Sequence, residues 1–401
     1  MGAKTNKFME IFKCMLFDKV ENCVLFDSFW GQYNDNPKYI SEKLHQLAPD
    51  IKIVWAVSEK KSRETIPEYA VPVKYGSTEY YKYRYSAEVL VDNYTGIMGK
   101  MGNLDVSKFL RSKKHLRIST WHGTPLKRID RDIQSRKTAG IARVSDYLIA
   151  GCRYTAKILN NAFCDNYPVM LTGTPRNDIL FRDDIDSDFI RTKLKIPPDK
   201  RIVLYAPTFR DNIEAYRKMQ MDSSGIKLLL AGLSEKFGGE WVFVSRAHQA
   251  IFLEVGEGKQ GDSGVILDGN VGDDMAEYLS VSDVLITDYS GSLFDFALTG
   301  KPCFLYAPDR EHYENKERGF YMDYDSLPFP ISYTVDKLLK DVNCFDNKQY
   351  GKDVGLFLKS IGNVEDGRAS ERIALDIIRF INTGEKPRSG GTQDFFISEK
   401  I

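Results

Sequence analysis

The stretch of residues 118–128 holds the residue best suited to acid–base chemistry. A short extended run ends at His122, after which Gly123, Thr124 and Pro125 are expected to close a turn and open a helix. Thr124 suits the N-cap and Pro125 the first helical position, where a missing N–H costs nothing. A helix beginning there places partial positive charge beside the imidazole. The block predicts a proton acceptor next to an anion site, although helix initiation alone also explains Thr-Pro.

A second block, residues 284–302, reads as a buried strand, a polar turn and a helix. Ser290 and Ser292 supply hydroxyls, and the backbone N–H groups around Gly291 supply further donors. Such a turn binds a diphosphate without a metal, although helix capping places the same residue types here. Asp295, one turn into the helix, is placed to bond a ribose or polyol hydroxyl, or only to complement the helix dipole.

A third group of polar residues follows the strand expected at residues 241–245. Arg246 and His248 have alternate spacing, so both side chains point the same way, which suits a phosphate better than a core. Two further turns, residues 171–178 and 204–211, each follow a strand and offer an arginine with a hydroxyl. Ligands of open parallel sheets bind beyond the carboxyl ends of the strands. Together, these five turns predict a single anionic ligand.

The elements that carry these turns alternate between short apolar runs and helical patterns, which is typical of parallel βαβ units. Strands are predicted at 23–26, 51–57, 71–74, 89–92, 117–120, 147–150, 169–172, 201–205, 241–245, 265–267, 284–287 and 303–306. Helices are predicted at 37–47, 155–162, 225–237, 274–280, 292–298 and 369–382. We therefore expect an α/β fold of two doubly wound, Rossmann-like domains that face a central cleft, with a charged seam at 183–200.

Composition limits the function classes. The chain has 401 residues, 42% of them hydrophobic, and equal numbers (56 each) of basic and acidic residues, so no global field favours nucleic acid. The six cysteines form no Cys-x-x-Cys pair and read as free thiols, which argues against zinc. No apolar run approaches the roughly eighteen residues needed to cross a bilayer. A helix expected at residues 7–17 would lie on a membrane surface or pack on its domain.

Taken in order, these blocks resemble the CDP-glycerol glycerophosphotransferase family, whose members prime and polymerise wall teichoic acid and related polyol-phosphate capsules. The resemblance is carried by residues 120–127, 173–178, 205–210, 246–248 and 287–295, with an early pattern at 26–37. It implies a GT-B-type fold and transfer of a polyol phosphate, glycerol phosphate in the first instance, from a CDP-activated donor to an acceptor hydroxyl, with release of CMP. CDP-glycerol or CDP-ribitol is then a substrate, and no cofactor or metal is expected.

The resemblance also implies roles for single residues. His122 is expected to act as general base, and His248 to stabilise the leaving CMP phosphate as a second catalytic residue. The residues expected to bind substrate are Trp121, Gly123, Thr124, Pro125, Leu126, Arg176, Pro207, Thr208, Arg210, Arg246, Ala247, Ser290, Gly291, Ser292 and Asp295. The family usually has a second serine where this chain has Gly291, which removes a hydroxyl and keeps the backbone donor.

The resemblance assigns each part of the chain a task. Residues 1–190 are expected to form the acceptor-side domain, 191–365 the CDP-donor-binding domain, and 366–401 a helix that crosses back and a flexible tail. The expected acceptor is a lipid-linked or oligomeric polyol phosphate or saccharide, met by a peripheral protein at the cytoplasmic face of the membrane. A nucleotide-sugar glycosyltransferase of the same fold and a degenerate, non-enzymatic scaffold are the alternatives.

Overall fold

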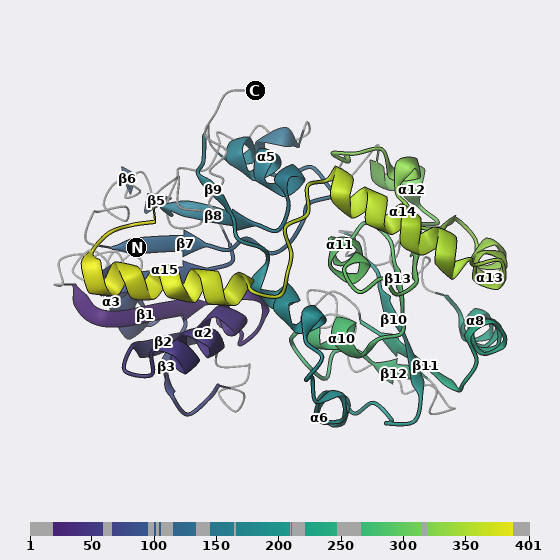
Figure 1. Cartoon of the computed structure of the whole chain (residues 1–401), viewed down its shortest axis with the longest axis horizontal. Helices are drawn as coiled ribbons and strands as arrows, with labels where there is room; N and C mark the ends of the chain where they lie inside the picture. Colours follow the sequence, from purple (N-terminus) through teal and green to yellow (C-terminus); the bar gives the residue numbers. More distant parts are fainter. Residues whose placement is uncertain are drawn as a thin grey trace, which may run out of the picture. The chain divides into compact units, whose positions relative to one another are not determined.

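The chain folds into two compact units (Figure 1). The computed structural model describes residues 19–58, 66–94, 100–101, 104–105, 115–133, 145–163, 166–208, 210, 221–246, 266–314 and 319–387. Unit 1 comprises Met1–Gly123, Ile129–Phe181 and Asn363–Ile401, and unit 2 comprises Thr124–Arg128 and Arg182–Gly362. The units thus separate at Arg182, nine residues before the seam drawn from the sequence at 190/191, and the C-terminal segment belongs to unit 1.

Unit 1 is built on a seven-stranded, all-parallel sheet. Its strands are β1 (Val20–Asp27), β2 (Lys52–Val57), β3 (Ala70–Lys74), β4 (Ala87–Asp92), β7 (Leu116–Ser119), β8 (Tyr147–Ala150) and β9 (Val169–Leu171). They lie in the order β3-β2-β1-β4-β7-β8-β9, and all seven strands predicted for the first half of the chain are confirmed. A separate antiparallel pair joins β5 (Lys100–Met101) to β6 (Leu104–Asp105).

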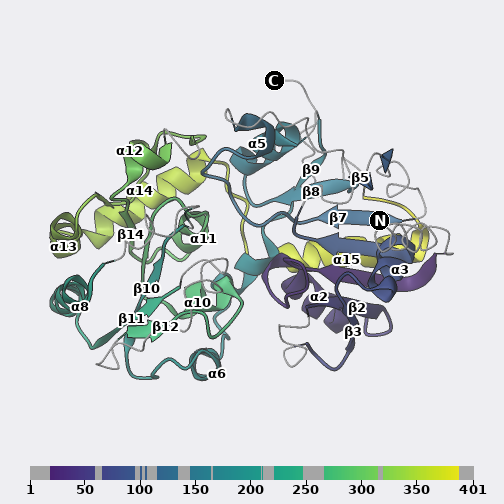
Figure 2. The same ribbon diagram turned by 180° about the vertical axis from the view of Figure 1, so that it is seen from behind.

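Helices cover both faces of the unit 1 sheet. They are α2 (Asp35–Leu47), α3 (Thr78–Ser86), α5 (Arg153–Ala162) and α15 (Ala369–Thr383), with 3-10 turns η2 (Asp130–Asp132) and η3 (Pro175–Phe181). Phe26 of β1 packs with Ile377 of α15 in one core, whereas its neighbour Leu25 packs with Tyr80 of α3 in the other. This alternation along the strand places α15 on one face (Figure 1) and α3 on the opposite face (Figure 2).

The C-terminal helix α15 is tied to the turn that carries Arg176. Both carboxylate oxygens of Asp178, in η3, accept backbone N–H groups of the first helical turn, from Ala369 at 2.9 Å and from Ser370 at 2.7 Å. An acidic acceptor satisfies N–H groups that have no partner within the helix and complements the dipole. The helix ends at Gly384, whose φ of +70° is the usual left-handed stop.

Unit 2 contains a six-stranded parallel sheet in the order β12-β11-β10-β13-β14-β15. Its strands are β10 (Arg201–Ala206), β11 (Trp241–Ser245), β12 (Ile266–Asp268), β13 (Val284–Thr287), β14 (Cys303–Tyr306) and β15 (Ile331–Ser332). Its helices are α6 (Ser187–Lys193), α8 (Ser223–Phe237), α10 (Met275–Val281), α11 (Ser292–Ala297), α12 (Arg310–His312), α13 (Val335–Asn343) and α14 (Asn347–Ser360), with the 3-10 turn η5 (Tyr324–Ser326). The two Rossmann-like sheets predicted from the sequence are confirmed, and their facing of one cleft stays a prediction.

The prediction that a helix begins at Thr124 is wrong. Residues 124–128 are extended, and Lys127 forms an antiparallel bridge with Phe320. The carbonyl of Leu126 accepts the N–H of Tyr321 at 2.9 Å, and the N–H of Arg128 donates to the Gly319 carbonyl at 2.8 Å. These backbone groups are satisfied by a second chain segment, so no helix begins at Thr124.

Some predictions concern residues that the structure does not describe. The helix at 7–17 and the site residues Ala247 and His248 lie outside the described ranges. Within those ranges, no disulfide joins the cysteines Cys23, Cys152, Cys303 and Cys344. No described helix combines the length and apolar character required to span a membrane.

Candidate active site

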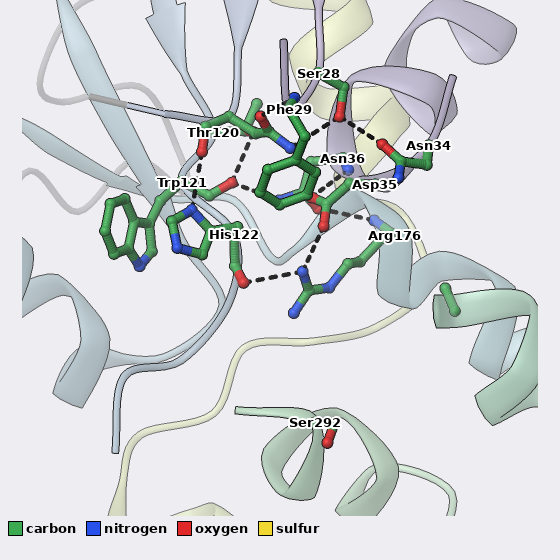
Figure 3. A network of polar contacts seen from close by, with 12 residues as sticks. Ser28, Phe29, Asn34, Asp35, Asn36, Thr120, Trp121, His122, Arg176 and Ser292 are labelled. Carbon is green, nitrogen blue, oxygen red and sulfur yellow. Dashed lines mark hydrogen bonds and ion pairs between the residues drawn. The ribbon is translucent and has the colours of Figure 1, made fainter. Parts of the chain in front are cut away.

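His122 lies just beyond the carboxyl end of β7, with its side chain exposed (Figure 3). Its Nδ1 atom is 3.0 Å from the backbone carbonyl oxygen of Asn93, the residue that follows β4. A carbonyl only accepts hydrogen bonds, so we assign the proton of the neutral ring to Nδ1. The lone pair is then on Nε2, which is the tautomer that a general base needs.

Asn93 is itself held by the loop after β1. Its side-chain amide donates to the Ser28 hydroxyl at 2.9 Å, and its side-chain oxygen accepts the backbone N–H of Phe29 at 3.1 Å. Ser28 in turn donates to Asn34 at 2.7 Å. Because β1, β4 and β7 are neighbours in a parallel sheet, the loops after them meet at one edge. Three loops distant in sequence therefore fix the imidazole.

Arg176 locks the backbone on the other side of His122. One guanidinium nitrogen donates to Asp35 at 2.7 Å and to the His122 carbonyl at 2.9 Å, and the Arg176 backbone N–H donates to Asn36 at 3.0 Å (Figure 3). Gly123 has a φ of +115°, and a Cβ there would overlap the guanidinium. Arg176, predicted to line the nucleotide, thus holds the loop that carries the imidazole, and only glycine fits next to it.

Sequence reasoning assigned no role to Asp35, Asn36 or Asn93. Asn36 donates to the Trp121 carbonyl at 3.1 Å, which completes the link between the start of α2 and the His122 loop. Asp35 is buried with a φ of +55°, an uncommon conformation for a residue other than glycine. Two features of the sequence could have indicated these residues. One is the Asp-Asn-Pro run at the start of a helix, and the other is a polar residue directly after the strand that ends at Asp92.

A buried polar cluster lies under this edge of the sheet. Asp27 accepts the Tyr80 hydroxyl at 2.6 Å and the Tyr94 hydroxyl, while Arg84 lies 3.6 Å from Asp27 and 3.5 Å from Asp92. Burial raises the pKa of Asp92 to about 7 and raises that of Asp27 as well, although Arg84 opposes both shifts. Burial and the sharing of one guanidinium thus make these two carboxyls bind protons at a higher pH than exposed carboxyls do.

The turn after β13 is organised by a buried ion pair in unit 2. Asp288 accepts the backbone N–H groups of Thr208 at 2.7 Å and Tyr289 at 2.5 Å, and it pairs with Arg210 at 2.8 Å. Arg210 also donates to Asp309 at 2.8 Å and is fully buried. Arg210 thus fixes the turns after β10 and β13, and its contact with substrate stays a prediction.

Ser290, Gly291 and Ser292 follow this ion pair. The Ser292 hydroxyl donates to the Ser290 hydroxyl at 3.0 Å, and Ser290 remains partly exposed. A Cβ placed on Gly291 would lie 2.8 Å from the carbonyl oxygen of Thr124, which also belongs to unit 2. Glycine at position 291 is therefore required by the close packing of the Thr124 segment. Asp295, within α11, is buried.

Arg246 follows β11 and holds a loop by its guanidinium. It donates to the carbonyls of Gly269 and Gly272 at 2.7 Å each and of Asp273 at 2.9 Å, and it stacks over Tyr278. Burial lowers the pKa of Arg246 from its ordinary value. The three hydrogen-bond acceptors are neutral carbonyls, whereas the carboxylates of Asp273 and Asp274 interact with the positive charge through space.

The structure gathers the predicted residues into two groups, one in each unit. Unit 1 holds Trp121, His122, Gly123 and Arg176. Unit 2 holds Thr124, Pro125, Leu126, Pro207, Thr208, Arg210, Arg246, Ser290, Gly291, Ser292 and Asp295. Their contacts with substrate stay predictions.

Known proteins resemble this chain over most of its length. A family model described as CDP-Glycerol:Poly(glycerophosphate) glycerophosphotransferase matches residues 8–379. The teichoic acid poly(glycerol phosphate) polymerase of Staphylococcus epidermidis is 31% identical over 383 residues, covering 89% of this chain and 51% of that protein. The teichoic acid glycerol-phosphate transferase of Staphylococcus aureus is 30% identical over 380 residues, covering 90% of this chain and 93% of that protein. This chain spans about half the length of the Staphylococcus epidermidis polymerase.

A solved structure supports the same relationship. The wall teichoic acid polymerase TagF, determined as a variant soaked with CDPG, matches with a TM-score of 0.76 at 31% identity, over 94% of each chain. The α/β, GT-B-type fold expected from the sequence is confirmed by this likeness together with the two parallel sheets. On the match of residues 8–379, this chain belongs to the CDP-glycerol:poly(glycerophosphate) glycerophosphotransferase family.

Proposed function

We propose that this chain transfers glycerol phosphate from CDP-glycerol to an acceptor hydroxyl, with release of CMP, in the synthesis of teichoic acid or a related cell-surface polymer. The observation that carries the proposal is the 3.0 Å contact between Nδ1 of His122 and the Asn93 carbonyl, in a chain that belongs to this family. The contact orients the imidazole on a strand-end loop, and in the neutral ring it leaves the lone pair on Nε2.

The transfer consists of one substitution at phosphorus. The acceptor oxygen forms a bond to the phosphorus that bears the glycerol, and the bridging bond from that phosphorus to the CMP oxygen breaks. The acceptor proton passes to Nε2 of His122, and CMP leaves with the bonding electron pair. General-base assistance of this kind contributes about 10²–10⁴-fold in rate. Positioning and electrostatics supply most of the remainder in phosphoryl transfer.

Unit 2 is proposed to bind the CDP-donor through the turns after β10, β11 and β13. Among the described residues, the Thr208 hydroxyl is buried and has no hydrogen-bond partner, which supports a role toward a ligand oxygen. Arg246 brings a guanidinium whose hydrogen-bond acceptors are neutral carbonyls. Ser290 adds a partly exposed hydroxyl. These groups are suited to stabilise negative charge that develops on the CMP phosphate.

We further propose that the acceptor is lipid-linked or oligomeric and that the protein meets it as a peripheral protein at the cytoplasmic face of the membrane. Unit 1 is proposed as the acceptor side. The reaction is proposed to proceed without a metal. Among the described residues, no group of three or more His, Cys, Asp or Glu side chains is arranged to hold a metal ion.

The experiment is a transfer assay with the purified chain and a lipid-linked acceptor. Radiolabelled CDP-glycerol, CDP-ribitol and a nucleotide sugar are offered separately, with and without EDTA. We expect acceptor-linked label and stoichiometric CMP from CDP-glycerol, unchanged by the chelator. Preferred use of CDP-ribitol corrects the donor, sugar transfer refutes the reaction type, and loss of activity in EDTA refutes metal independence. Failure to bind any CDP ligand favours a scaffold.

A further inference from the structure

A continuous row of aromatic rings runs through the His122 site of unit 1. The row, called here the aromatic row, consists of Phe163, Trp121, His122, Phe29, Trp30 and Tyr94. Successive ring centroids are 5.0, 3.8, 5.7, 6.4 and 5.5 Å apart in that order. Figure 3 shows the rings of Trp121, His122 and Phe29 side by side. The imidazole is thus flanked by aromatic rings on both sides.

The middle of the aromatic row is open, whereas its two ends are buried. Phe163 and Tyr94 at the ends are 3% and 7% exposed, and the Tyr94 hydroxyl is bonded to Asp27. Trp30 is 48% exposed, although it stacks on Tyr94. Stacking on Tyr94 therefore leaves about half of the indole accessible to a ligand. The row therefore presents anchored rings with accessible surface next to the imidazole.

The backbone of three members of the row is strained. Phe29, Trp30 and Trp121 have φ values of +38°, +60° and +53°, in the left-handed region that bulky residues rarely adopt. The surroundings hold this conformation, because the Phe29 N–H is bonded to Asn93 and the Trp121 carbonyl to Asn36. Strain of this kind persists where the surroundings enforce it, and it clusters at ligand sites. The backbone strain is thus a second observation, independent of the exposure of Trp30, that points to a ligand.

The chemistry of the row favours a neutral ligand with an apolar face. Indole and phenyl rings offer flat, uncharged surfaces. Arg176, which holds the His122 carbonyl, is engaged by Asp35 at 2.7 Å. A sugar ring has C–H groups on one face and hydroxyls around its edge, so it can lie on an aromatic surface while an edge hydroxyl meets a base. Phosphodiesters, by contrast, are bound most strongly through charge-assisted hydrogen bonds from arginine or lysine.

We propose that the aromatic row binds a sugar ring of the acceptor, with Trp30 as the main stacking surface, and so presents a ring hydroxyl to Nε2 of His122. This inference rests on the proposed function for the role of the imidazole, and it narrows the acceptor to one that ends in a saccharide. It predicts that the acceptor site selects a glycoside over a glycerol-phosphate terminus.

The test compares two soluble acceptors with the same apolar aglycone, one ending in a pyranose and the other in glycerol phosphate. For the full chain and its Trp30→Ala variant, kcat and the KM values of both acceptors and of CDP-glycerol are measured. We expect Trp30→Ala to raise KM for the pyranose acceptor about tenfold and to leave KM for CDP-glycerol unchanged. Trp30→Phe, which keeps a ring, restores most of the affinity. Phe189→Ala, at a 65% exposed ring on α6 of unit 2, is the matched control and changes nothing.

A binding measurement separates this inference from the transferase activity. Saturation-transfer NMR of the unmodified chain with the pyranose acceptor, without donor, should show the C–H protons of the sugar in contact with aromatic protons, and Trp30→Ala should abolish the effect. The binding measurement gives a result even if the chain turns over no CDP donor. The measurement on the unmodified chain also gives a result if Trp30→Ala fails to fold. An unchanged KM in folded Trp30→Ala, equal loss for both acceptors, or no saturation transfer to the sugar overturns the proposal.

Discussion

The imidazole of His122 and the backbone carbonyl of Asn93 are 3.0 Å apart, and they come from loops after two adjacent parallel strands. A backbone acceptor cannot be ionised or removed by a side-chain change, so the tautomer that it selects is a property of the fold. The side chain of Asn93 is bonded in turn to Ser28 and Phe29. The orientation of the base is therefore set by the sheet edge.

Replacement of the base should separate chemistry from binding. We expect His122→Ala to lower kcat by about 10²–10⁴-fold, because the acceptor proton then has no positioned acceptor. The dissociation constant for CDP-glycerol, measured by calorimetry, should stay within about threefold, because unit 2 is the proposed donor site. His45→Gln, on α2 in the same unit, is the control with normal turnover. Near-normal transfer by His122→Ala would refute the assignment of the base.

Arg176 should matter through the loop that it holds. Its guanidinium serves Asp35 and the His122 carbonyl together, which the single ammonium of lysine on a flexible stem does not reproduce. We expect Arg176→Lys to lower kcat by about 10–100-fold, as misplacement of a catalytic group does. Arg182→Lys, in an exposed ion pair with Asp184, should leave kcat unchanged. Equal kcat values in the two variants would show that the Arg176 contacts do not position the base.

A serine at position 291, which the resemblance to the family implies, should harm this protein. In Gly291→Ser, the new Cβ lies 2.8 Å from the Thr124 carbonyl oxygen, so the Thr124 segment or the turn after β13 must move. We expect at least a tenfold loss of transfer and a Tm lowered by several degrees. Gly351→Ser is the control, because a Cβ on Gly351 meets nothing within 4 Å. Activity equal to or above that of the parent would show that this packing is dispensable.

The buried Asp92 should make stability fall as the pH rises. Its pKa is raised from 3.8 to about 7 in the folded state by burial, so the protonated form favours folding and this stability is lost as the pH rises through 7. Between pH 6 and pH 8 the loss is about 1.4 kcal/mol for one such group. Urea unfolding of the parent and of Asp92→Asn at both pH values measures it.

The test compares how much the free energy of unfolding changes between pH 6 and pH 8 in the parent and in Asp92→Asn. The absolute stability of the variant is not the readout. Asp92→Asn removes one carboxyl from the pair that shares Arg84, so its stability at either pH shifts for other reasons too. We expect the variant to lose less between pH 6 and pH 8 than the parent does. Identical slopes would place the retained proton elsewhere, with Asp27 as the other carboxyl of the cluster.

The sequence alone determined the sheets and the turns that carry the site. Buried parallel strands are short, continuous apolar runs, so residues 241–245, 284–287 and 303–306 were predicted with the bounds that the structure gives. The polar residues after them follow from the rule that ligands lie beyond the carboxyl ends of such strands. The His122 turn and the Ser290–Ser292 turn were found in this way. The ordered blocks also sufficed to indicate the family.

Tertiary structure decided how the backbone and the charged side chains are used. Thr124 and Pro125 favour a helix locally, yet their segment is extended because residues 319–321, nearly 200 positions later, supply its backbone partners. The sequence places Arg210 after a strand, but only the fold pairs it with Asp288 and Asp309. The acceptor for His122 is a backbone carbonyl, which every residue possesses. Local pattern encodes periodicity and turn chemistry, whereas partners distant in sequence are chosen only when the chain folds.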